Sequence, residues 1–320
     1  MKIIYYGCSR FTAFFQTCII NFLNTEYIMK NWHTNYPNRF NLDSDEDFKK
    51  WRDEKLSAYP ENVGDLVVEL GNMTSLSGTE KTKIQELIVL ANMCIFTVGS
   101  APINMDSLLA LGKQLGVSNT DKSVRHSKSD ELTDSGILNR AIPFSTRHVH
   151  WHTDATYYGS NKTIQSLFLL CKRPAIEGGF NKVLDNEILY IQLRDKAPDA
   201  LKILMSDGCF MYKNPKTGEI HPELGGKVFW TNPEGHLNYR FSFRKMDMAW
   251  SEDSDVIAAK EVLESIILNE SDYVIEGRLE SGMGLISNNV MHTREKLIDS
   301  DEAEKKRLLF RTRYYDRVDA

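Results

Sequence analysis

The sequence predicts a mixed fold in which a β-rich part and flanking α-helices form one compact domain. From residue 148 onward, short runs of β-branched and aromatic residues alternate with turn residues, as in a protein of many short strands. Two longer segments with helical spacing interrupt these runs, at about 185–205 and at 254–269. No internal repeat, low-complexity tract or Pro- or Ser-rich linker divides the 320 residues, which favours one domain over two.

The composition supports a globular protein and argues against several functional classes. Hydrophobic residues make up 42% of the chain and charged residues 26%, which excludes general disorder and coiled-coil repeats. The formal net charge of −5 argues against a dedicated nucleic-acid binder, because such proteins carry a basic excess. Five cysteines without CxxC spacing argue against a disulfide framework or a zinc ribbon. We therefore expect a reducing, cytoplasmic location, with Cys94 and Cys171 as small core residues.

The N-terminal segment needs a separate interpretation. Residues 3–23 are apolar, but Arg10 and Gln16 interrupt the run, and both are costly at the centre of a bilayer. No small-x-small cleavage site follows the run, so we expect no membrane attachment. Met29 is an alternative start, and we interpret residues 1–28 as an N-terminal extension and 29–320 as the domain.

The first half of this domain predicts alternating helices and strands. They are, in chain order, a short surface helix within 40–62, a strand at 63–70, a helix and then a buried strand over 79–100, and a helix at 104–116. The last helix has Asn104 or Asp106 as a cap and Gly116 as a stop. The polar segment 117–147 lacks periodicity and predicts a long loop, of the kind that forms lids over active sites.

The second half predicts mainly strands. Their segments are HVHWHTDATYY, TIQSLFLLCKRP, NKVLD after the turn Gly178-Gly179, YVIEGRLESGMGLISNNVMHTR and RLLFRTRYYDRV. The segment 214–226 is rich in turn residues and lacks the GxxxxGK[ST] pattern, so we interpret it as a surface excursion and not as a phosphate loop.

Two short motifs carry the residue types of a metal site. His152 and Asp154 are two residues apart, so on an extended segment their side chains point to the same face. His292 follows 140 residues after His152, behind an apolar, glycine-punctuated stretch. Two histidines and one carboxylate that leave coordination positions open suit a redox-active iron(II) centre. An HxD pair also occurs by chance, and taken alone a histidine at the surface or the edge of the core is its commoner explanation.

Arginines punctuate the last predicted strand. Arg307, Arg311 and Arg313 are separated by four and two residues, so all three face one side of a strand. An arginine that points inward needs an anion, because a buried guanidinium without a partner is costly. It would suit a bidentate contact to a carboxylate. The alternative is a solvated basic edge strand that deters aggregation.

The order of HxD, Gly-Gly, distal His and Arg resembles that of the TauD/TfdA-like family of iron(II)- and 2-oxoglutarate-dependent dioxygenases. The resemblance covers about residues 90–318. It is closest in MCIFTVGSAPINMDSLLALGKQLG, WHTDATYY, EGGFNKVLD, NNVMHTREKL and RLLFRTRYYD. It implies a double-stranded β-helix core, that is, a jelly-roll or cupin-like barrel, with flanking α-helices.

The resemblance also implies roles for individual residues. It implies His152, Asp154 and His292 as iron ligands and Arg311 as the clamp that binds the far carboxylate of 2-oxoglutarate. Arg311 lies 19 residues after His292, a longer gap than in the taurine-type members, and Arg307 is the competitor for the clamp role.

Other positions are matched more loosely. Asn181 stands after the Gly-Gly pair, where the family often has a Thr or Ser that contacts 2-oxoglutarate. Arg294 fits the HxR motif of some members, in which it lines the site or forms an ion pair. Trp151, Tyr157 and Tyr158 flank the metal motif and are either substrate contacts or core packing.

The implied activity uses iron(II), 2-oxoglutarate and dioxygen to hydroxylate a small amino-acid-like or small anionic substrate, with release of succinate and CO2. Desaturation on the same centre is an alternative outcome, and Asp154 disfavours halogenation. Rivals of other classes are a non-catalytic jelly-roll binding protein and a zinc hydrolase, although HExxH is absent. We expect no nucleic-acid or membrane partner, and the sequence leaves the oligomeric state open.

Overall fold

The computed structural model describes residues 32–99, 102–121, 131–133, 145–159, 162–214, 217–244, 248–269 and 272–319. The predicted extension 1–28 and most of the predicted lid loop 117–147 lie outside these ranges. Within them, no helix has both the length and the apolar character that crossing a membrane requires.

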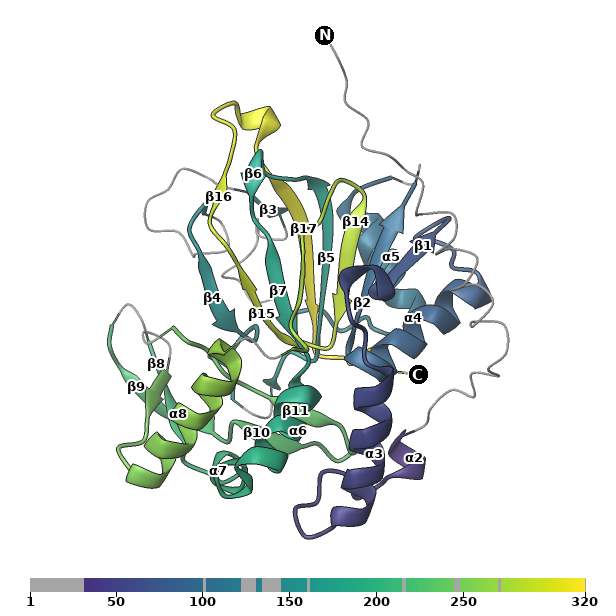
Figure 1. Ribbon diagram of the computed structural model, residues 1–320. Coiled ribbons are helices and arrows are strands. Elements are labelled where there is room, and N and C mark those ends of the chain that lie inside the picture. The colour runs from purple at the N-terminus through teal and green to yellow at the C-terminus, as the bar shows by residue number, and fades with distance from the viewer. Residues whose placement is uncertain are drawn as a thin grey trace. The chain divides into compact units, whose positions relative to one another are not determined.

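A six-stranded sheet forms one wall of the described domain (Figure 1). Its strands are, in spatial order, β1 (Val67–Leu70), β2 (Met93–Val98), β14 (Met283–Ser287), β5 (Ser166–Arg173), β17 (Leu308–Tyr314) and β3 (Glu131–Leu132). Only the pair β1 and β2 is parallel, and every other pairing in this sheet is antiparallel.

A four-stranded antiparallel sheet faces the first one. Its order is β13 (Ile275–Gly277), β7 (Asn181–Leu184), β15 (Met291–Arg294) and β4 (Val149–His152). Arg311 on β17 reaches Asp154, just after β4, with 3.4 Å between Nη1 and Oδ2, so the two sheets approach each other here. A short pair, β6 (Glu177–Gly178) and β16 (Leu297–Ile298), lies beyond one end of the second sheet (Figure 1).

Two helices cover the outer face of the six-stranded sheet. α4 (Gly78–Ala91) begins at a capping box between Ser77 and Glu80, and α5 (Met105–Gln114) is capped by Asn104. Their apolar residues pack on Phe168, Phe310 and other side chains of the sheet. Gly112 of α5 allows the close approach, because a Cβ atom at this position would collide with the ring of Tyr314 on β17.

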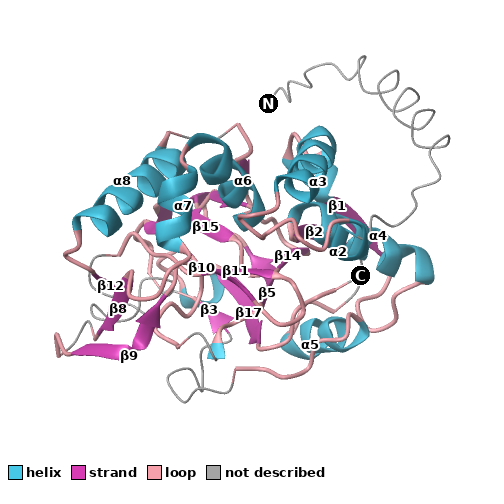
Figure 2. Ribbon diagram, turned by 90° about the horizontal axis from the view of Figure 1, so that it is seen from below, coloured by secondary structure: helices cyan, strands magenta, loops and turns pink. Residues whose placement is uncertain are grey.

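A second, larger core lies between the remaining helices and the ends of the sheets (Figure 2). The elements around it are α2 (Trp32–Asn35), α3 (Asp45–Ala58), α6 (Asn186–Lys196), α7 (Pro198–Leu204), α8 (Ser254–Leu268) and the hairpin of β10 (Phe229–Thr231) and β11 (Leu237–Tyr239). A further small sheet has the order β12 (Met248–Trp250), β8 (Phe210–Lys213), β9 (Ile220–Gly226).

Several predicted elements are confirmed and others need correction. The helix and buried strand of 79–100 and the helices of 104–116 and 254–269 are present as α4, β2, α5 and α8. The single helix predicted over 185–205 is two helices, because a proline at position 198 disfavours helical geometry at Ala197. The excursion predicted at 214–226 contains β9. The segment 63–70 begins with a 3-10 turn, Val63–Leu66, before its strand.

The described cysteines fit their predicted role. Cys94 and Cys171 are fully buried, and together with Cys209 they are free thiols. Burial is the main influence on the Cys171 thiol and raises its pKa to about 12, so this thiol stays protonated. These side chains therefore act as small core residues.

The helix within 40–62 is more buried than predicted, because it carries a charge network. Lys55 of α3 is fully buried, with its Nζ 2.6 Å from Asp185 Oδ2 and in contact with Glu187. Asp185 also caps α6 by accepting a hydrogen bond of 2.9 Å from the backbone N–H of Glu187. The network therefore joins α3 to the start of α6.

We expect Lys55→Met to lower the free energy of unfolding by about 3–5 kcal/mol, since it leaves two buried carboxylates without their cation. Urea denaturation measures this loss. The matched control is Lys49→Met, which removes an exposed lysine of the same helix and should unfold near the wild-type midpoint. Equal midpoints for the two variants would show that the buried network contributes nothing.

Candidate metal centre

The pairing of β4 with β15 brings the two predicted histidine ligands together. In this antiparallel pair His152 lies directly opposite His292. Their ring centroids are 4.3 Å apart, with 49° between the ring planes. His152 is buried and His292 is partly buried, so the two imidazoles line an internal position between the sheets.

Asp154 completes the group. Its Oδ1 atom lies 3.5 Å from His152 Nε2 and 4.0 Å from His292 Nε2. One donor atom from each of the three residues lies within 4.8 Å of the other two. Donors that share one metal ion at about 2.1 Å are separated by about 3 Å, so a small contraction of this group suffices to hold an ion. The next residue, Ala155, is left-handed (φ +60°), so the chain turns sharply after the carboxylate.

Both imidazoles are oriented by backbone carbonyls. His152 Nδ1 donates to the carbonyl of His150 at 2.8 Å, and His292 Nδ1 donates to that of Val290 at 2.9 Å. In a neutral ring, a proton on Nδ1 leaves the lone pair of Nε2 available to a metal ion, and in both rings Nε2 is the atom that faces Asp154. Hydrogen bonds from Nδ1 to an oxygen acceptor fix this tautomer in histidines that bind metals.

Asn289 forms two hydrogen bonds with the backbone of Asp154, and no motif in the sequence indicated this role. Its Oδ1 accepts from the Asp154 N–H at 2.8 Å, and its Nδ2 donates to the Asp154 carbonyl at 3.2 Å. Nδ2 also donates to the carbonyl of Ile164 at 2.9 Å. Asn289 is itself left-handed (φ +51°), a conformation that asparagine adopts more readily than most residues. The loop before β15 therefore positions Asp154, and β15 itself supplies His292.

The surroundings of the centre keep Asp154 ionised and His292 neutral. Burial raises the pKa of Asp154, but the positive charge of Arg311, the bond to His152 and the charge of Arg313 outweigh it and hold the pKa well below its usual value. Burial and the neighbouring His152 lower the pKa of His292 to about 4, against the opposing charge of Asp154. An ionised carboxylate and a neutral imidazole are the forms that bind metals.

A network of tyrosines extends from the centre along β17. Arg313 Nη1 lies 3.9 Å from Asp154 Oδ2 and donates to the hydroxyl of Tyr157 at 3.0 Å. Its Nη2 donates to Asp121 at 2.6 Å, and Asp121 also accepts from Tyr158 at 3.1 Å. Both tyrosines predicted as substrate contacts therefore lie in a network beside the centre. Asp121, which anchors the network, carried no signal in the sequence.

The other two residues suggested as substrate contacts make different interactions. Trp151, adjacent to His152, packs against the larger core. The Arg294 side chain donates to the carbonyl of Ser145 at 2.8 Å and to that of Arg147. These bonds hold the chain segment that leads into β4, so the contacts of Arg294 are with protein backbone.

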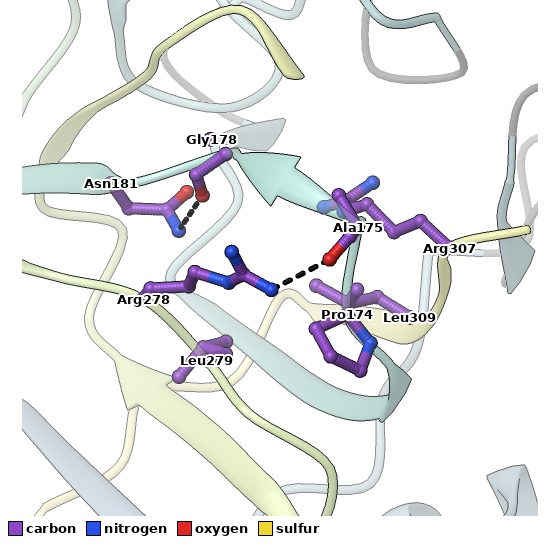
Figure 3. Close-up of a pocket in the computed structure, with 9 residues that line it drawn as sticks. Pro174, Ala175, Gly178, Asn181, Arg278, Leu279, Arg307 and Leu309 are labelled. Atoms are coloured by element: carbon purple, nitrogen blue, oxygen red, sulfur yellow. Dashed lines mark hydrogen bonds between the residues drawn. The ribbon is translucent and has the colours of Figure 1, made fainter. Parts of the chain in front are cut away.

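A small, partly open pocket brings together Asn181 and Arg307 (Figure 3). Arg278 lines it too and donates to the carbonyl of Ala175 at 2.6 Å. Arg307 is only 9% exposed, and its guanidinium makes no hydrogen bond or ion pair with any residue that the structure describes. Burial lowers the pKa of Arg307, although Cys171 and Asp299 raise it. A buried arginine beside a pocket can bind the carboxylate of a ligand there, because a buried guanidinium needs an anionic partner.

Comparisons with known proteins agree with this geometry. The model of a family described as "Taurine catabolism dioxygenase TauD, TfdA family" matches residues 53–313. A curated relative, the "Uridine-5'-phosphate dioxygenase" of a Streptomyces species, is 26% identical over 170 residues, which are 51% of this chain. The match spans 60% of the length of that relative.

Solved structures share the fold at low sequence identity. The non-heme iron oxygenase OrfP in complex with Fe has a TM-score of 0.57 at 12% identity, over 75% of this chain and 80% of that one. An asparagine oxygenase in complex with Fe(II), 2S,3S-3-hydroxyasparagine and succinate has a TM-score of 0.55 at 10% identity, over 89% and 90%. A putative alpha-ketoglutarate-dependent taurine dioxygenase from Burkholderia xenovorans has a TM-score of 0.55 at 15% identity, over 80% and 91%.

We expect Asn289→Ala to weaken metal binding at His152, Asp154 and His292 by about 10–100-fold, because the backbone that carries Asp154 loses both of its bonds to the amide. Anaerobic titration with iron(II) measures the affinity, and circular dichroism checks that the variant is folded. The control is Asn269→Ala, an exposed asparagine at the end of α8, which should bind iron like the wild type. Unchanged affinity in Asn289→Ala would remove its positioning role.

Proposed function

Because the chain belongs to the TauD, TfdA family of dioxygenases, we propose that it is an iron(II)- and 2-oxoglutarate-dependent oxygenase of a small molecule. The observation that carries the proposal is the group of His152, Asp154 and His292, in which backbone carbonyls orient both imidazoles and the carboxylate is ionised. We also infer that the two facing sheets form the double-stranded β-helix expected for this family. Their antiparallel strands and the likeness to iron oxygenase structures support this inference.

The residues fit iron(II). Two neutral imidazoles and one carboxylate leave coordination positions open for a co-substrate and dioxygen, as in other non-haem iron oxygenases. When bound, the iron and 2-oxoglutarate supply the oxidising power, with succinate and CO2 as products and hydroxylation of the substrate as the expected outcome. The protein orients the ligands through the carbonyls of His150 and Val290 and keeps Asp154 ionised through Arg311 and Arg313.

For the far carboxylate of 2-oxoglutarate we propose Arg307 as the clamp, in place of Arg311. A co-substrate that chelates the metal with its keto-acid end places its other carboxylate several bonds away. Arg311 lies against the metal ligand itself, 3.4 Å from Asp154 Oδ2. Arg307 lines the pocket together with Asn181, and its buried guanidinium forms no ion pair with a described residue. Arg311 then acts beside the metal, where it balances the charge of Asp154.

The substrate we propose is amino-acid-like or a small anion. The solved neighbours support a small molecule, since OrfP was solved in complex with (3S)-hydroxy-L-Arg and the asparagine oxygenase with 3-hydroxyasparagine. The curated relative is named for uridine-5'-phosphate. A screen that measures substrate-dependent release of succinate from 2-oxoglutarate, across amino acids, nucleotides, sulfonates and dicarboxylates, identifies the class. If no compound in the screen increases succinate release, the proposal of an amino-acid-like or small anionic substrate is contradicted.

We expect the anaerobic protein with iron(II) and 2-oxoglutarate to show the weak visible charge-transfer band of the chelate. His292→Ala should abolish this band, because it removes a ligand. His221→Ala should retain it, since His221 pairs with Glu219 and Glu223 outside the centre. Wild-type protein that binds iron but shows no band in the presence of 2-oxoglutarate would contradict the proposed function.

Titration of the same band with 2-oxoglutarate tests the clamp. We expect Arg307→Ala to raise the dissociation constant of 2-oxoglutarate by about 10–100-fold, through the loss of a charged hydrogen bond. Arg311→Ala should chiefly weaken iron binding, because it removes the main positive charge beside Asp154. The opposite pattern, with co-substrate affinity lost only in Arg311→Ala, would restore Arg311 as the clamp.

A further inference from the structure

A second group of metal-ligand side chains lies outside the centre described above. It consists of His33 on α2, His236 in the turn between β10 and β11, and Asp319 near the C-terminus. His236 Nε2 lies 3.1 Å from Asp319 Oδ2, and the rings of His33 and His236 are 4.2 Å apart. One donor atom from each residue lies within 4.8 Å of the other two, the same limit that the first group meets.

The backbone of Asp319 is fixed, although it lies near the end of the chain. The preceding Val318 exchanges two hydrogen bonds with the side chain of Asn288, at 3.2 and 3.0 Å. The carbonyl of Asp319 accepts a bond of 3.1 Å from Gln85 on α4. These contacts fix the backbone of Asp319 beside His236, and its exposed carboxylate is held by the contact with His236.

The two histidines are also held by their surroundings. His236 sits in a turn closed by Asn232, whose side chain accepts from the His236 N–H at 2.8 Å. Arg39 fastens α2 to this turn, because it donates to the carbonyls of Tyr36 and Gly235 at 3.2 Å each. Three segments that are distant in the sequence therefore present their side chains to one point, as a preorganised metal site requires.

The charge at this point favours one class of metal. Arg39 Nη2 lies 3.0 Å from Nδ1 and 3.4 Å from Nε2 of the His33 ring, and because a guanidinium only donates, a metal ion bound by His33 would displace this contact. The single carboxylate of Asp319 only balances Arg39, and this excludes a strong site for Ca²⁺ or Mg²⁺, which need several oxygen ligands.

We propose that His33, His236 and Asp319 form a second metal site, which binds Zn²⁺ or a chemically similar divalent transition metal. Two imidazoles and one carboxylate are ligands that zinc prefers, and water completes its coordination. The bound ion would join α2, the β10–β11 turn and the C-terminal segment, so its role would be structural. The site goes beyond the proposed function and does not rest on it.

Titration with Co²⁺, a spectroscopic substitute for zinc, tests the proposal. We expect the wild type to bind two equivalents, and His152→Ala/His292→Ala, which lacks the first centre, to bind one. Adding His236→Ala or Asp319→Asn to this background should abolish the remaining site. Zn²⁺ should raise the melting temperature of the background variant by several degrees and leave the triple variant unchanged. His236→Ala alone should keep the iron-dependent charge-transfer band.

The matched control is His221→Ala in the same background, because His221 also lies 3.1 Å from a carboxylate, that of Glu223, but belongs to neither group of three ligands. It should still bind one equivalent of Co²⁺. No uptake by the background variant, or equal uptake after Asp319→Asn, would overturn the second site. Failure of the first centre gives a different result, namely one equivalent in both the wild type and the background variant.

Discussion

The antiparallel pairing of β4 with β15 is the constraint on which the site depends. It places His152 opposite His292, and a slip of one residue would turn one of the two side chains to the other face of the sheet. The position of the third ligand, Asp154, depends on the same strand. Asn289, just before β15, forms hydrogen bonds with both the N–H and the carbonyl of Asp154. Ligand geometry thus follows from one strand register and one amide side chain.

Among the described residues, some buried cations have carboxylate partners and Arg307 does not, and we assign the paired ones a structural role and Arg307 a role in ligand binding. Lys55 lies between two carboxylates that offset its charge, as a structural network requires. Arg313 is likewise balanced by Asp121. Arg307, in contrast, is buried beside a pocket, and its guanidinium forms no ion pair with a described residue. A protein that retains such a cation carries a destabilising feature that a ligand carboxylate can relieve, and this asymmetry underlies our choice of clamp.

The sequence predicted those parts of the structure that depend on local patterns. Helical spacing and caps located α4, α5 and α8, and the two-residue spacing of His152 and Asp154 together with the distant His292 indicated the metal group. What it missed depends on tertiary contacts. The roles of Asn289 and Asp121 appear only when distant strands meet, and so does the grouping of His33 with His236 and Asp319. The end of α6 before Ala197 could have been predicted from the proline that follows, but the sequence interpretation placed one helix there.

We propose that His152, Asp154 and His292 hold iron, with the far carboxylate of 2-oxoglutarate on Arg307. Crystals grown without oxygen, in iron(II) and 2-oxoglutarate, can be examined by anomalous diffraction at the iron edge. We expect an anomalous peak within bonding distance of all three side chains, and density for the co-substrate that ends on Arg307 in the pocket with Asn181. Iron bound elsewhere, with no peak between β4 and the start of β15, would contradict it.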